Sequence, residues 1–141
     1  MKEGMTTNIL VVGKNAQNVE LARDAIDEMD YQIIPAPSMS LALFLAQKNL
    51  PELILCGTEL MDGDPQAFLK EVQADDELRQ IPFMLLTANQ VDEKDGKRWL
   101  TMGAALVLPT DISATELFST IQPYIESRLA RKEERVVETS E

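Results

Sequence analysis

The side chains that most often carry out chemistry in enzymes are scarce in this sequence. It has 141 residues, no histidine and one cysteine, Cys56. These counts exclude histidine-based triads, imidazole bases, internal disulfides and multi-cysteine zinc sites. Cys56 follows three apolar residues, where a buried thiol is expected to be inert packing rather than a nucleophile or redox sensor. We therefore expect no enzymatic activity.

The remaining groups that could bind a ligand are acids and hydroxyls. Glu59, Asp62 and Asp64 stand close together and carry the oxygen ligands that hard metal ions prefer. Asp64 directly precedes Pro65, which is the pattern of a helix N-cap followed by a first-turn proline. The other two acids fit an exposed loop. We therefore expect neither a metal site nor a cofactor.

The composition is strongly acidic. Lysine and arginine number 13 and aspartate and glutamate 24, which gives a formal net charge of −11. Such a surface repels nucleic acids and anionic membranes, so proteins are the expected partners. The longest strictly apolar run, residues 41–46, is far shorter than the ~20 residues of a membrane span. The N-terminus lacks the apolar core of a secretory signal, and we expect a cytoplasmic location.

The elements that must position these groups follow from hydrophobic patterning. Short runs that are apolar throughout predict strands covered on both faces, and the intervals between them leave room for helices. The runs are residues 9–12, 31–35, 53–56, 83–86 and 105–108. This alternation predicts a (βα)5 domain with a parallel sheet.

The segments between the runs carry helix signals. The first predicted helix has one apolar face, made of Val19, Ala22, Ala25, Ile26 and Met29. The others begin or end at recognisable caps. These signals are Ser38 and Leu50-Pro51 for the second helix, Asp64-Pro65 for the third, Asp92 and Gly103 for the fourth, and Ser113 to Glu116 for the fifth.

The fifth helix has an apolar seam that ends near residue 129. The seam consists of Leu117, Ile121, Ile125 and Leu129. Pro123 removes a backbone donor, which predicts a kink or a restart of the helix near that residue. The charged residues from Glu126 onward, Arg128 among them, predict a solvated end.

Four phrases in this pattern closely resemble the receiver domain of two-component response regulators. They occupy residues 9–12, 51–55, 75–82 and 86–88. The resemblance covers residues 8–130 and implies a flavodoxin-like three-layer sandwich with strand order 2-1-3-4-5. It leaves residues 1–7 as an N-terminal tail and residues 131–141 as a charged helix extension or linker stub.

The resemblance also implies where receiver chemistry would lie. In that family a nucleophilic aspartate on the third strand, two acids after the first strand, a Thr or Ser ending the fourth and a Lys ending the fifth bind Mg²⁺ and a phosphoryl group. Here Gly57 stands at the nucleophile position, Gly13 and Lys14 at the acidic pair and Thr110 at the lysine. Only Thr87 keeps the family's residue type. These departures imply a degenerate receiver that is not phosphorylated at the usual site.

Two of these positions have alternative interpretations. Lys14 either replaces the metal as a fixed positive charge, which holds the pocket in one state or binds an anion beside Thr58 and Thr87, or is an ordinary surface lysine at a loop tip. Thr87 either switches between inward and outward positions or satisfies backbone groups at a strand end.

The fourth predicted helix carries more large apolar residues than one inward stripe needs. Trp99 and Met102, with Val107 at the position of the family's switch aromatic, are candidates for binding a partner. Receivers use the surface of the fourth helix, fifth strand and fifth helix for docking and dimerisation. The alternative is that Trp99 covers the core.

The favoured hypothesis is a phosphorylation-independent receiver-like signalling module that acts by protein–protein interaction in two-component-type regulation. Its partner would be a kinase, an output domain or a second copy. The alternative is a small-ligand or anion sensor that uses the C-terminal edge of the sheet. Its pocket would be formed by Gly13, Lys14, Gly57, Thr87 and Thr110.

Overall fold

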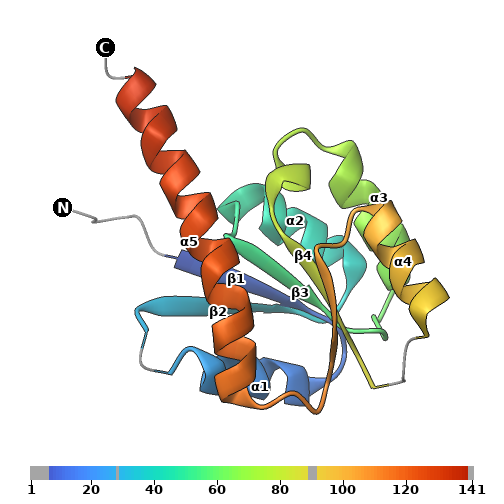
Figure 1. Ribbon diagram of the computed structural model, residues 1–141. Helices are drawn as coiled ribbons and strands as arrows, with labels where there is room; N and C mark the ends of the chain where they lie inside the picture. The colour runs from blue at the N-terminus through green and yellow to red at the C-terminus, as the bar shows by residue number, and fades with distance from the viewer. Residues whose placement is uncertain (1–6, 28, 89–91, 140–141) are drawn as a thin grey trace.

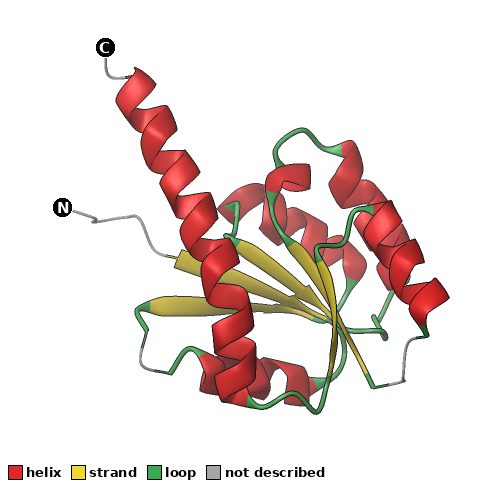
Figure 2. Ribbon diagram, in the orientation of Figure 1, coloured by secondary structure: helices red, strands yellow, loops and turns green. Residues whose placement is uncertain are grey.

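The computed structural model describes residues 7–27, 29–88 and 92–139, and its centre is a parallel sheet (Figure 2). The sheet has five strands in the order β2-β1-β3-β4-β5, which confirms the predicted flavodoxin-like topology. The strands are β1 (Thr7–Val12), β2 (Tyr31–Ala36), β3 (Leu53–Cys56), β4 (Phe83–Thr87) and β5 (Leu106–Pro109).

Helices cover both faces of the sheet, as the continuously apolar strands require (Figure 1). They are α1 (Ala16–Ala25), α2 (Met39–Asn49), α3 (Pro65–Ala74), α4 (Glu93–Met102) and α5 (Ala114–Thr139), with a short 3₁₀ helix at Leu78–Gln80. None of the helices in these described ranges is long and apolar enough to cross a membrane.

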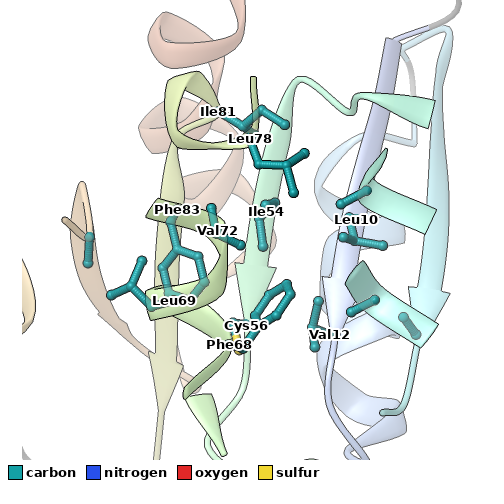
Figure 3. Close-up of a cluster of buried hydrophobic side chains, with 14 residues drawn as sticks. Leu10, Val12, Ile54, Cys56, Phe68, Leu69, Val72, Leu78, Ile81 and Phe83 are labelled. Atoms are coloured by element: carbon teal, nitrogen blue, oxygen red, sulfur yellow. The ribbon is translucent and has the colours of Figure 1, made fainter. Parts of the chain in front are cut away.

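The two faces contain separate hydrophobic cores, and β1 contributes to both by alternation. Leu10 and Val12 pack with Phe68 of α3 in one core, which Figure 3 shows, and the rings of Phe68 and Phe83 lie 5.9 Å apart. Ile9 and Val11 pack in the other core, with residues of α1 and α5. Burial on both faces fixes β1 and β3 as the rigid centre of the molecule.

Most helix caps confirm the sequence signals. The Ser38 hydroxyl accepts the N–H of Leu41 at 3.2 Å, and the Asp64 carboxylate accepts the N–H of Ala67 at 2.8 Å. At the end of α4, Gly103 adopts φ +118°, a left-handed conformation that favours glycine.

The first helix is shorter than its apolar pattern predicted. α1 ends at Ala25, Ile26 is its C-cap, and Met29 lies beyond the helix with 36% of its surface exposed. Including Met29 in the buried helical face was therefore wrong. The Ile26 N–H still bonds to Ala22, but the Met29 N–H donates to Ile26 three residues back, which closes a turn instead of continuing the helix.

The fifth helix does not restart at Pro123. α5 is continuous from Ala114 to Thr139, and its last turns extend beyond the sheet (Figure 1). Ile121 and Ile125, both fully buried, hold the turns on either side of Pro123 against the sheet. This packing accounts for the helix continuing where local backbone preference alone would interrupt it.

The solvent-exposed end of α5 also begins later along the chain than the sequence predicted. Arg128 is buried, and its guanidinium lies 3.4 Å from the Glu52 carboxylate, which is itself buried at the start of β3. A second guanidinium nitrogen of Arg128 donates to the carbonyl of Gln80 at 3.5 Å. The expectation that Arg128 is solvated was therefore wrong, because a carboxylate distant in sequence pairs with it.

Candidate functional site

A pocket of about 290 Å³ opens at the C-terminal edge of the sheet. Its walls come from the loops that follow β1, β3, β4 and β5, the edge at which open α/β sheets bind ligands. The lining residues are Lys14, Asn15, Asn18, Gly57, Thr58, Glu59, Leu86, Ala88 and Thr110.

The loop after β1 is tied to its neighbours through the backbone. The N–H of Gly13 donates to the carbonyl of Ala36 at 2.9 Å, and the N–H of Lys14 donates to the carbonyl of Glu59 at 2.8 Å. Gly13 has φ +133°, a conformation that L-residues with a side chain rarely adopt. A side chain at position 13 would therefore be strained.

Gly57 forms part of the pocket floor directly after β3. Its N–H donates to the carbonyl of Val12 at 2.8 Å, which extends the β1–β3 pairing by one residue. A Cβ at this position would lie 2.9 Å from the side-chain Nδ2 of Asn18, closer than such contacts normally come. The space that a side chain at position 57 would use is therefore occupied by Asn18.

Asn18 comes from the first turn of α1 and is only 5% exposed. Its main-chain N–H donates to the carbonyl of Asn15 at 3.1 Å. Within the part of the chain that the structure describes, no hydrogen bond to its side-chain amide is formed. Most of the Asn18 side chain is buried, and its amide borders the pocket and is accessible from it.

Of the lining residues that the structure describes, one is a cation and one is an acid. Lys14 and Glu59 are both exposed at its rim, and among the described residues neither takes part in an ion pair. Thr58 and Thr110 add hydroxyl groups, whereas Leu86 and Ala88 add apolar surface. The site can therefore offer charge, hydrogen bonds and a small apolar contact to a ligand.

Thr87 is placed differently from the other predicted pocket residues. It is buried at the end of β4, and its carbonyl accepts the N–H of Thr110 at 3.1 Å. The pocket lining includes Lys14, Gly57 and Thr110 but not Thr87. Gly13 adjoins the pocket through its backbone, since a Cβ there would lie 3.6 Å from the Cα of Gly57.

Comparison with known proteins identifies the family. No family model matches the chain. The polar-differentiation response regulator DivK of Brucella ovis is 31% identical over 121 residues, which cover 86% of this chain and 98% of DivK. The chain belongs to the response regulator receiver family. It is therefore a receiver domain of two-component signalling, a class that generally signals through other proteins rather than by catalysis.

Solved receiver structures have the same fold. The signal receiver domain of a LuxO repressor protein from Vibrio parahaemolyticus matches with a TM-score of 0.80 at 19% identity, over 94% of this chain and 98% of that one. A response regulator from Chloroflexus aurantiacus matches with a TM-score of 0.76 at 23% identity, over 86% and 98% of the two chains.

The acids that follow β3 in this receiver serve the backbone. Asp62 accepts hydrogen bonds from the hydroxyl of Ser40 and the N–H of Met39, and so joins its loop to the start of α2. The Ser40 hydroxyl and the backbone donors hold the pKa of Asp62 below its ordinary value. Asp64 caps α3. Within residues 7–27, 29–88 and 92–139, no acid or cysteine cluster has the arrangement of a metal site.

The single thiol of the receiver lies below the pocket floor. Cys56 is fully buried, and its Sγ lies 3.3 Å from the carbonyl of Gly57 as a hydrogen-bond donor. Burial raises the pKa of Cys56 far above the ordinary value of 9.0. The thiol therefore stays protonated and unreactive in the folded protein.

Sequence reasoning missed the amide that borders the receiver's pocket. Asn18 was not singled out, although it precedes the buried residues Ala22 and Ile26 by four and eight positions and so lies on the buried face of α1. A polar residue at helical spacing within an apolar face is the signal that could have found it. Asn15 and Glu59 also line the pocket, but their positions depend on how the loops fold, and no pattern in the sequence indicates them.

The candidate partner residues of the receiver lie on its α4 side. Trp99 and Met102 are partly buried and pack against the core shared with α2 and α3. Val107 is half-buried in β5, and Leu100 is 49% exposed on α4. Trp99 thus contributes to the core with part of its surface and leaves the rest accessible.

Proposed function

We propose that this receiver signals by binding a protein partner without aspartyl phosphorylation and without Mg²⁺. The observation that carries the proposal is Gly57. It follows β3 at the position where the receiver family has its nucleophilic aspartate, and it has no side chain that could form an acyl phosphate. Asn18, a neutral amide, occupies the space beside it that a side chain at position 57 would use.

The metal-binding half of the site has changed as well. Gly13 and Lys14 stand where the family has the two acids that bind Mg²⁺. The Lys14 ammonium, which lines the same pocket as Gly57, repels a divalent cation. Among the described residues, Glu59 is the one that supplies a carboxylate to the pocket lining, whereas hard cations are held in such sites by several carboxylates.

The surface of α4, β5 and α5 is our candidate for the partner contact. Trp99, Met102 and Val107 each keep part of their surface exposed there. Aromatic and methionine side chains are enriched in protein interfaces, where they bury apolar area without adding charge. A kinase, an output domain or a second copy of this chain would fit such a surface.

A titration with Mg²⁺ and beryllofluoride, observed by amide NMR, tests phosphorylation independence. Beryllofluoride mimics a phosphoryl group on the receiver aspartate. Because this chain has Gly57 at that position, we expect no shifts of the amide signals of Gly13, Gly57 or Thr87. A receiver with all the acids of the family is the positive control. Saturable Mg²⁺-dependent shifts at those residues would refute the proposal.

A second candidate function is favoured by the pocket itself. A volume of about 290 Å³ remains open beside Lys14, Gly57 and Thr110. Replacement of a phosphorylation site by a ligand site would make the domain a sensor of a small molecule or anion. Both functions can operate in one domain, since the pocket and the α4–β5–α5 surface are different parts of the molecule.

A further inference from the structure

We propose that the pocket binds a small monoanion that carries its own hydrogen-bond donor, such as a hydroxy-carboxylate or dihydrogen phosphate, without a metal ion. This inference rests on the sensor function given above as the second candidate. It concerns reversible binding only, and no covalent bond to the protein is formed.

The first argument is the side chain of Asn18. It is 95% buried, since 5% of its surface is exposed, and it lines the pocket without a described hydrogen-bond partner for its amide. Neither atom of this amide is both fully enclosed and unsatisfied, so the amide is accessible from the pocket. A polar ligand in the pocket could therefore hydrogen-bond to it directly.

The second argument is charge. Lys14 lines the pocket and forms no ion pair among the described residues, in a chain whose net charge is −11. An ammonium in an acidic molecule normally has many carboxylates available nearby. At this rim an anionic ligand would supply the counter-charge, and a charge-assisted hydrogen bond would hold it in place.

The third argument concerns the kind of anion. Glu59 lines the same pocket, so the two charged side chains together have no net charge. A dianion would be repelled by Glu59, whereas a monoanion with a hydroxyl or acidic O–H can face Lys14 with its charge and Glu59 with its donor. The hydroxyls of Thr58 and Thr110 complete a polar lining with donors and acceptors.

The experiment compares glycolate with acetate, which lacks the hydroxyl donor, by amide NMR in the presence of EDTA. We expect saturable shifts at Gly57, Thr58 and Ala88, and tighter binding of glycolate than of acetate. A separate titration with inorganic phosphate shows whether the pocket binds phosphate or a carboxylate more tightly. EDTA should leave the affinities unchanged, because no metal takes part.

Three variants, one of them a control, test the roles of the charged side chains. Lys14→Ala should weaken glycolate binding about tenfold, the value of one charge-assisted hydrogen bond. Lys48→Ala removes the same charge from an exposed lysine near the end of α2, which leads into the start of β3 at the sheet edge away from the pocket, and it should leave binding unchanged. Glu59→Gln should narrow the preference for glycolate over acetate.

The result that overturns this inference differs from the one that overturns phosphorylation independence. Absence of saturable shifts with all three anions, or equal binding to Lys14→Ala and the native chain, would refute the ligand site. A covalent phosphoryl adduct would refute phosphorylation independence. Each result is measured separately, by shifts in one case and by intact mass in the other.

Discussion

Gly57 and Asn18 together determine what the C-terminal edge of the sheet can hold. A Cβ at position 57 would approach the Asn18 amide to 2.9 Å, and a Cβ at position 13 would lie 3.2 Å from the carbonyl of Glu59 on a backbone with φ +133°. A side chain at either position would therefore meet a close contact, and at position 13 also an unfavourable backbone conformation. Restoring the acids means moving Asn18 and straining the loop after β1.

The variant Gly57→Asp should therefore not restore phosphorylation by itself. The new carboxylate would displace the Asn18 amide and pair with Lys14, which lines the same pocket, instead of binding Mg²⁺. Labelling with acetyl phosphate, followed by intact mass, measures this. Rapid phosphoryl uptake by the single variant would show that Lys14 does not interfere.

The variant Gly13→Asp should lower the free energy of unfolding by about 1–3 kcal/mol, because an aspartate at this position must adopt the left-handed backbone of Gly13. Lys14→Asp is the matched control, since Lys14 is exposed and not in the left-handed region. Urea unfolding of both variants provides the comparison, and equal stability of the two would contradict the strain argument.

Cys56 gives a prediction about pH. Burial places its pKa above the ordinary 9.0, so the folded state retains a proton that the unfolded state loses. This stabilisation is fully present below pH 9.0 and is lost as the pH rises through the folded-state pKa. Alkylation with iodoacetamide at pH 8 should label unfolded but not native protein. Stoichiometric labelling of the native chain would contradict the assigned burial.

At the scale of elements, α5 is held against the rest of the molecule at two places along its length. Leu117, Ile121 and Ile125 are fully buried against the sheet, and one turn later Arg128 pairs with Glu52 at the start of β3. The pair lies at the edge of the sheet opposite the pocket, because Glu52 precedes β3 and Gly57 follows it. The body of α5 is therefore rigid up to residue 128, and the turns beyond it project from the sheet (Figure 1).

The variant Arg128→Ala should lower the free energy of unfolding by about 3–5 kcal/mol, because it removes the guanidinium that pairs with the buried Glu52 carboxylate. Arg131→Ala is the matched control, since Arg131 is exposed on the next turn of α5, and it should change stability by less than about 0.5 kcal/mol. A double variant, Arg128→Met with Glu52→Gln, should recover most of the loss. Equal effects of the two arginine variants in urea unfolding would contradict the buried pair.

Helix α4 carries the candidate docking residues and covers part of the core. Because Trp99 packs against the cluster shared with α2 and α3, Trp99→Ala should lower the free energy of unfolding by about 3 kcal/mol. Leu100→Ala, at a side chain that is 49% exposed, should have little effect on stability. Thermal unfolding of both variants measures this. Unchanged stability with weakened association would mean that Trp99 serves the interface instead.

Across the whole molecule, local patterns predicted the fold well. Apolar runs located the five strands, and caps such as Ser38, Asp64 and Gly103 located the helix ends, because these signals lie within a few neighbouring residues. The strand order came from family resemblance. Continuity of α5 through Pro123 depended on tertiary packing, which overrides local preference.

The candidate site was less predictable for a physical reason. The positions of Lys14, Gly57 and Thr110 follow from parallel strands ending at one edge, and they do line one pocket. The partners of Asn18 and Arg128 depend on which distant segments meet in the folded chain. Such pairings leave no local pattern beyond a polar residue at a buried helical position.

The most direct test of phosphorylation independence is exposure of the native chain to acetyl phosphate and Mg²⁺, followed by intact mass. A receiver that retains the family's acids serves as the positive control in the same buffer. Because Gly57 has no carboxylate to phosphorylate, we expect the mass of the chain to remain unchanged while the control gains one phosphoryl group. A stoichiometric phosphoryl adduct on the native chain, abolished by removal of Mg²⁺, would contradict the account.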